Sequence, residues 1–214
     1  MTNSFKFTKL DFFTMKSQLP GYLSLVFVVT LFSVMGSDII TICITSAWFT
    51  ALMSFNIFII QEKNKLNRLY GSVSISLKNI IQGRYLYIIL SYLMCLLLSL
   101  ILYLPLSYFK HITITKMDSL IGISLSLLIF TTIVGLQIPI LFKLGYTKGR
   151  IWSTIPFIVI MSLIPLPSFV SSLSNIITFI LSHTSLLIAV CLIASCIIYY
   201  LSYQLSVLVY QRQV

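Results

Sequence analysis

The stretch YLYIILSYLMCLLLSLILYLPLSY, residues 85–108, contains no charged side chain. A helix rises about 1.5 Å per residue and the hydrocarbon core of a bilayer is about 30 Å thick, so about 20 apolar residues cross it. The whole chain has the same character, because 58% of its 214 residues are hydrophobic and only 8% are charged. In a soluble domain, roughly a quarter of the residues are charged. The sequence therefore predicts an integral membrane protein.

The apolar segments predict an all-α, polytopic fold, since non-helical backbone cannot face lipid. Residues 1–18 mix aromatic residues with lysine, which is typical of a helix lying at the membrane surface. We therefore expect a connecting helix over 1–18 and one transmembrane domain over 19–214. The stretch PLPSFVSSLSNIITFILSHTS, residues 165–185, is apolar but punctuated by Pro and Ser, and favours a re-entrant segment. Six transmembrane helices fit the remaining pattern: residues 19–35, 39–60, 85–108, 119–142, 151–170 and 185–210.

The fourteen Lys and Arg residues lie unevenly around these spans. With the N-terminus inside, twelve fall in cytoplasmic segments and only Lys110 and Lys116 fall outside. This is the positive-inside pattern, and it predicts that both termini are cytoplasmic. The net charge of +10 is then a signal of topology and of attraction to anionic lipid, so no nucleic-acid partner is implied.

Groups for catalysis or ligation are scarce in the sequence. The predicted spans contain no Asp, Glu, His, Lys or Arg away from their ends, and no HExxH, GxSxG or phosphate-binding glycine loop is present. All four cysteines fall inside spans without ligand spacing. We therefore expect no enzyme activity, no metal, no disulfide and no cofactor held by this chain. The C-terminal tyrosines Tyr199, Tyr200, Tyr203 and Tyr210 indicate an interfacial belt and packing rather than a binding site.

The segment QEKNKLNRLYGSVSISLKNIIQGRYLY, residues 61–87, is the largest predicted cytoplasmic loop and carries five of the basic residues. Apolar positions recur there at helical spacing, at Leu66, Tyr70, Val73, Leu77 and Ile80. One face of this amphipathic segment should rest on an apolar surface and the other should meet headgroups or a protein. A basic loop that only fixes topology is the simpler alternative.

Three patches resemble a known family. They are KLDFFTMKSQL (residues 9–19), EKNKLNRLYGSVSISLKNIIQGRYL (62–86) and LQIPILFKLGYTKGRI (136–151). Together they are similar to ABC-2 type permease subunits of bacterial ABC exporters, in particular the small branch with phenol-soluble modulin exporters and peptide-antibiotic resistance permeases. Ser74 and Leu77 depart from the usual Pro and Arg of the second patch.

The resemblance implies a permease without its own ATPase site, paired with a second permease subunit and with cytoplasmic ABC ATPase subunits that bind ATP and Mg. The loop between spans two and three would be a coupling helix docked on the ATPase. The residues that the resemblance assigns are, for the ATPase contact, Glu62, Lys63, Arg68, Tyr70, Ser72, Val73, Ser76, Leu77, Lys78 and Arg84; for the cytoplasmic end of span four, Lys143, Gly145, Tyr146, Lys148 and Arg150; and for the connecting helix, Lys9, Asp11, Phe12 and Lys16.

The expected function is export of an amphipathic or hydrophobic cargo, such as a peptide or peptide antibiotic, across the cell membrane of a bacterium. Two alternatives stay open from the sequence. A substrate-capture subunit of an energy-coupling-factor importer also has six helices and about this length. A membrane protein that gives immunity to a membrane-active peptide without transporting it would need no ATPase.

Overall fold

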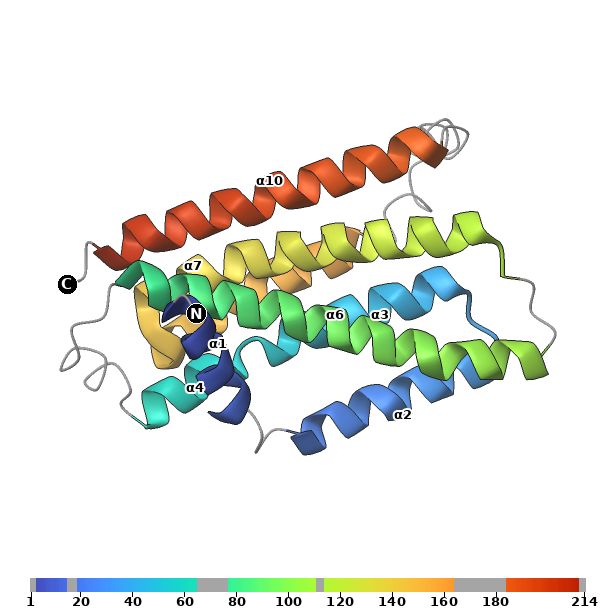
Figure 1. Ribbon diagram of the computed structural model, residues 1–214, viewed down its shortest axis with the longest axis horizontal. Coiled ribbons are helices and arrows are strands. Elements are labelled where there is room, and N and C mark those ends of the chain that lie inside the picture. Colours follow the sequence, from blue (N-terminus) through green and yellow to red (C-terminus); the bar gives the residue numbers. More distant parts are fainter. Residues whose placement is uncertain (1–2, 15–18, 65–76, 111–113, 164–183, 212–214) are drawn as a thin grey trace.

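The computed structural model describes residues 3–14, 19–64, 77–110, 114–163 and 184–211, and every regular element in these ranges is an α-helix. The all-α prediction is therefore confirmed for the described residues. Four of the helical stretches are long and apolar enough to cross a membrane, and a fifth apolar helix is shorter. The helices are α1 (Asn3–Thr14), α2 (Leu19–Met35), α3 (Ile39–Met53), α4 (Asn56–Lys63), α6 (Leu77–Phe109), α7 (Lys116–Leu163) and α10 (Thr184–Gln211) (Figure 1).

The predicted second span, residues 39–60, is two helices in the structure. A turn at Ser54 and Phe55 separates α3 from α4, and the backbone N–H of Phe58 donates to the Phe55 carbonyl at 2.9 Å. The two helices together still form one apolar stretch, Ile39–Lys63. The turn lets α4 leave the direction of α3 before the chain reaches its charged residues.

The predicted third span begins earlier than expected. Helix α6 starts at Leu77 rather than at residue 85, so its first two turns include Lys78 and Arg84. These two residues were expected in a loop segment, and that boundary was wrong. The apolar positions of residues 77–88 continue directly into the span, and nothing in this stretch forces the helix to stop.

The predicted spans that end at residue 142 and begin at residue 151 are joined in the structure by a kink rather than by an eight-residue loop. Helix α7 runs from Lys116 to Leu163 and is interrupted only at Gly145, whose φ of 70° and ψ of 177° are not helical. Glycine lacks a Cβ and adopts such positive φ values without strain. Figure 1 shows the ribbon turning at one end of the bundle, with the later, orange part of α7 heading back toward the middle. Residues 164–170 of the predicted fifth span, and almost all of the predicted re-entrant segment, lie outside the described residues.

Helices from both halves of the chain share one apolar core. Its larger cluster joins α3, α4, α6, α7 and α10, and a smaller cluster joins α2, α3 and α6. Many hydroxyl groups in this core donate to backbone carbonyls three or four residues earlier, such as Thr50 to Ser46 at 2.8 Å and Ser99 to Leu96 at 2.8 Å. Such bonds satisfy polar groups inside the same helix.

The two ends of the bundle differ. The chain reverses between α2 and α3 at Gly36, whose φ is 84°, and Lys110 Nζ donates to the carbonyl of Val34 at the same end. The opposite end holds α1, α4, the start of α6, the kink of α7 and the end of α10 (Figure 1). We call this opposite end the α4 end.

Candidate functional site

At the α4 end, Glu62 joins α4 to the kink of α7. The backbone N–H groups of Tyr146 and Thr147 donate to Glu62 Oε2 at 2.8 and 3.0 Å, and the Thr147 hydroxyl donates to Oε1. Because Gly145 interrupts the helix, these amides have no partner one turn earlier, so the carboxylate acts as an N-cap supplied from another helix. A negative charge also suits the positive end of the helix dipole. The last turn of α4 is thereby fixed to α7.

Beside this contact lies a buried cation. Arg84 on α6 is 1% exposed, and its guanidinium carbon lies 5.0 Å from the ring centre of Phe58 and 5.6 Å from that of Phe142. An arginine over an aromatic ring is attracted by the negative face of the ring, and more strongly where water is excluded. Among the described residues, the Arg84 Nη1 atom has no hydrogen-bond partner. Arg84 therefore links α6 to α4 and α7 through aromatic rings.

The N-terminal helix places an acid near this cation. In α1, Thr8 and Asp11 are buried, and the Thr8 hydroxyl donates to the Gly83 carbonyl of α6 at 3.1 Å. Phe12 meets the ring of Tyr87 edge to face at 5.0 Å. Burial raises the pKa of Asp11 from 3.8 to about 6, and the charge of Arg84 opposes that shift. Helix α1 is thus docked on the beginning of α6.

A cavity of about 390 Å³ opens at the α7 kink. The rings of Phe58 and Phe142 form part of its wall and meet edge to face at 5.2 Å. Phe142 also contacts Tyr210 of α10 at 5.5 Å, so the last turn of α10 joins the same group. Glu62 lines the cavity as well. Five helices therefore meet within one polar-rimmed region at the α4 end.

The structure brings together many of the residues that the sequence singled out. Lys9, Asp11 and Phe12 lie in α1; Glu62 and Lys63 end α4; Leu77, Lys78 and Arg84 lie in α6; and Lys143, Gly145, Tyr146, Lys148 and Arg150 surround the kink of α7. Within this set Asp11 and Arg84 are buried, whereas the Lys side chains and Arg150 are exposed. The remaining candidates lie outside the described residues: Lys16, Arg68, Tyr70, Ser72, Val73 and Ser76.

Comparison with known proteins identifies the family. A family model described as an ABC-2 family transporter protein matches residues 7–211. The chain belongs to the ABC-2 transporter family. The search of curated proteins and the search of solved structures gave no match. The family named from the three sequence patches is confirmed, and the narrower likeness to peptide exporters stays a prediction.

Membership makes this ABC-2 protein a multi-pass membrane component of an ABC transporter. Permeases of the family are transport components rather than enzymes, and they generally work with ABC ATPases. Among the described residues, no group of three His, Cys, Asp or Glu side chains is placed to hold a metal ion.

Two features of the ABC-2 protein were not predicted from the sequence. The hydrogen bonds of Glu62 join residues more than 80 positions apart, and no local pattern signals such a pairing. The tyrosines of α10 were expected to pack, and they do, since Tyr199 and Tyr203 contact the ring of Tyr85 at 5.2 and 5.6 Å. They also line a second cavity, for which the aromatic spacing alone gave no signal.

Proposed function

We propose that this ABC-2 protein is the permease subunit of an ATP-driven exporter, and that its α4 end faces the cytoplasm and receives an ABC ATPase subunit. The chain would cross the membrane six times. Helix α7 would supply two of these crossings, one before Gly145 and one after it. Two permease subunits and two ATPase subunits would form the working complex. ATP and Mg would be bound by the ATPase alone.

The observation that carries this proposal is the set of contacts made by the two helices that flank residues 65–76. The segment follows α4, whose Glu62 caps the α7 kink, and it precedes α6, whose Arg84 lies against Phe58 and Phe142. A push on the segment from a partner would therefore reach α4, α6 and α7 together. Closure of the ATPases could in this way shift the permease between inward and outward states.

The distribution of charge supports the orientation. Among the described residues, the exposed basic side chains in the elements of the α4 end are those of Lys9, Lys63, Lys78, Lys143, Lys148 and Arg150, whereas only Lys110 and Lys116 are exposed at the opposite end. Basic residues accumulate on the cytoplasmic side of membrane proteins. They would also give a polar rim around an apolar docking contact and steer an acidic partner surface.

The cargo is proposed to be amphipathic or lipid-like, such as a hydrophobic peptide. Most Ser and Thr hydroxyls that are paired in the described spans bond to their own helix, as Ser91 does to Ile88 and Ser195 to Leu192, each at 2.7 Å. Others, such as Ser202, bond to a tyrosine hydroxyl of another helix. Hydroxyls satisfied in this way leave a largely apolar surface. Such a surface suits a hydrocarbon-rich cargo better than an ion, whose desolvation needs charged or carbonyl ligands.

Co-purification with the ATPase of the same transporter tests the proposal. The tagged full chain is expressed with that ATPase, purified in mild detergent, and assayed for bound ATPase and for ATP hydrolysis. We expect a stoichiometric complex from the native chain. The triple variant Tyr70→Asp, Val73→Asp, Leu77→Asp should insert normally but lose the ATPase, because charge on the apolar face of residues 66–80 opposes docking.

The matched control places the same chemistry at the other end of the bundle. Tyr108→Asp with Phe109→Asp changes two aromatic residues that are 81% and 78% exposed, and it should retain the ATPase. A triple variant that still binds ATPase would refute the docking site. A native chain that binds no ATPase at all would refute the permease assignment and favour the immunity alternative.

A further inference from the structure

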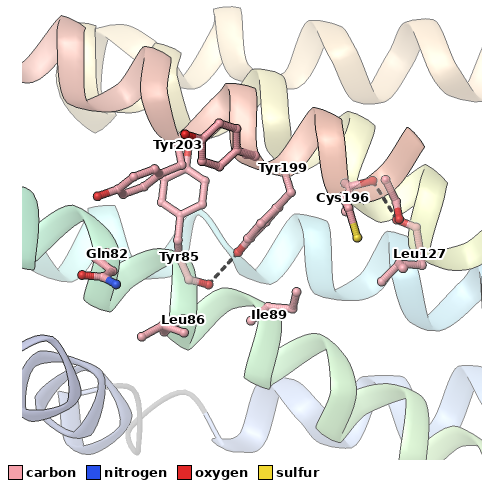
Figure 2. A pocket seen from close by; sticks show the side chains of 11 residues that line it. Gln82, Tyr85, Leu86, Ile89, Leu127, Cys196, Tyr199 and Tyr203 are labelled. Atoms are coloured by element: carbon pink, nitrogen blue, oxygen red, sulfur yellow. Dashed lines mark hydrogen bonds between the residues drawn. The ribbon is translucent and has the colours of Figure 1, made fainter. Parts of the chain in front are cut away.

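A groove runs along the side of the bundle between α6 and α10, away from the α4-end cavity. Its volume is about 380 Å³, and α7 contributes part of its floor (Figure 2). Pockets that hold small ligands have volumes of about 300–1,000 Å³. Its lining residues on α6 are Gln82, Tyr85, Leu86 and Ile89, and on α10 they include Cys196, Tyr199, Tyr200 and Tyr203.

Several polar atoms of the groove floor are already paired. The Tyr85 hydroxyl bonds to the hydroxyls of Ser202 and Ser206 at 2.6 and 2.7 Å. The Tyr199 hydroxyl donates to the Tyr85 carbonyl at 2.6 Å (Figure 2). Thr131, on α7, donates to the Leu127 carbonyl at 2.9 Å. The floor therefore presents ring faces and aliphatic carbon rather than open donors and acceptors. An occupant of this part must be hydrocarbon.

The groove also changes character along its length. Figure 2 shows Gln82 and Tyr203 at one end and Leu127 and Cys196 at the other. Lys78 precedes Gln82 by four residues, so it lies one turn further along the same face of α6, about 6 Å beyond that polar end. Lys78 is exposed. An apolar trough that ends at an exposed cation matches a molecule with a hydrocarbon tail and an anionic head.

We propose that the groove binds an acyl chain of an anionic membrane phospholipid, with the lipid phosphate at Lys78. One helical turn from the lining residues of α6 and α10 lie the apolar side chains of Leu90, Leu93, Leu192 and Ile193, which are 38–61% exposed. In a membrane these side chains contact lipid, so the ligand is present at high concentration. The bound lipid contacts both α6 and α10. Helix α6 follows residues 65–76, the proposed docking segment for the ATPase. The amount of anionic lipid in the membrane thereby affects the contact between α6 and α10.

One cysteine in the groove supplies a built-in probe. Cys196 lines the groove and is exposed, whereas Cys43, Cys95 and Cys191 are buried. The experiment measures the rate at which a lipid-soluble maleimide modifies Cys196 in the full transporter purified in detergent. Mixed micelles of phosphatidylglycerol or of phosphatidylcholine are then titrated in, and Cys196→Ser gives the background rate.

Phosphatidylglycerol is expected to slow labelling at lower concentration than phosphatidylcholine. In the Lys78→Gln variant this preference should fall by about fivefold, the change that one lysine near an anionic surface makes to affinity. The matched control, Lys116→Gln, removes an exposed lysine at the far end of the bundle and should keep the preference. Equal protection by the two lipids in the native chain would overturn the proposal.

A second copy of the chain is the competing occupant, and the same measurement separates it. If a second copy covers the groove, Cys196 is unreactive before any lipid is added, and an oxidant joins two chains through Cys196. Either result would refute lipid binding here. Neither result bears on ATPase docking, which is tested independently at the α4 end.

Discussion

The α4 end and the contact between α6 and α10 hold helices together by different chemistry. At the α4 end the joining groups are charged: Glu62 caps the α7 kink, and Arg84 lies buried between two aromatic rings with Asp11 nearby. At the α6–α10 contact the groups are neutral, with the Tyr85 hydroxyl bonded to two serines.

The difference follows from the surroundings of each contact. Burying a charge deep in a span costs much free energy because no water solvates it there. A charge near the end of a span can be stabilised by neighbouring groups or by solvent. Hydrogen bonds between neutral hydroxyl groups add only a modest stabilising free energy, but they fix the orientation of one helix against the other. The charged contacts can also change with protonation or with a partner. We therefore expect substitutions at the α4 end to have larger and more condition-dependent effects than those at the α6–α10 contact.

Replacement of Arg84 should have the largest effect. Arg84→Ala removes the cation that contacts Phe58 and Phe142 and leaves Asp11 buried without a nearby positive charge. Truncating a long buried side chain costs about 2–5 kcal/mol, and this variant also removes the cation–ring contacts and the charge that favours ionised Asp11. We expect the thermal unfolding midpoint of the purified transporter in detergent to fall by about 10 °C.

The double variant Arg84→Met, Asp11→Asn is the control for this prediction. It removes both charges and keeps apolar volume, so it should recover much of the loss, because exchanging a whole buried pair for neutral groups is often nearly neutral. A double variant as unstable as Arg84→Ala would mean that Asp11 does not sense Arg84. The double-variant cycle then measures their coupling directly.

Asp11 should give a smaller effect that depends on pH. Its pKa of about 6 in the folded protein lies above the ordinary value, so the folded state binds an extra proton between about pH 4 and pH 6. The free energy of unfolding therefore falls as pH rises through this window, by about 3 kcal/mol. Asp11→Asn should remove this component, and thermal unfolding at pH 4.5 and 7.5 measures it. The same pH dependence in both proteins would contradict the burial of this carboxyl group.

The sequence predicted the features that depend on composition and local pattern. The apolar run of residues 85–108 lies within α6, and the match over residues 7–211 confirms the family named from three short patches. Helix boundaries were less accurate. The third span was expected to begin at residue 85, after the amphipathic segment that includes Lys78 and Arg84, yet residues 77–84 already belong to α6. A charge count cannot tell an exposed lysine from an arginine that aromatic rings from other helices cover.

The site was predictable as a set of residues but not as a set of contacts. Glu62 and Gly145 were both singled out, but their relation depends on a kink that gives two amides no partner in their own helix. That relation exists only once α4 and α7 are placed side by side. The groove at Tyr85 and Tyr199 was missed for a similar reason, because tyrosines that pack against each other and tyrosines that line a cavity have the same helical spacing.

The smallest of these effects is expected at the α6–α10 contact. Tyr85→Phe keeps the ring contacts with Tyr199 and Tyr203 but removes the hydroxyl that bonds Ser202 and Ser206. Hydrogen bonds between helices in membranes contribute about 0.6 kcal/mol on average, so two of them should cost about 1 kcal/mol and about 3 °C in the unfolding midpoint.

The matched control for Tyr85 is Tyr200→Phe. The Tyr200 side chain is 61% exposed, and its hydroxyl accepts a hydrogen bond from Gln204 on its own helix at 2.8 Å. Its removal should leave the midpoint unchanged, because no contact between helices is lost. Equal losses in the two variants would mean that the two hydroxyls act through the general polarity of their helices, α6 and α10, rather than through bonds between them. A larger loss at Tyr85 would show that neutral bonds between helices, rather than ring packing alone, hold α10 against α6.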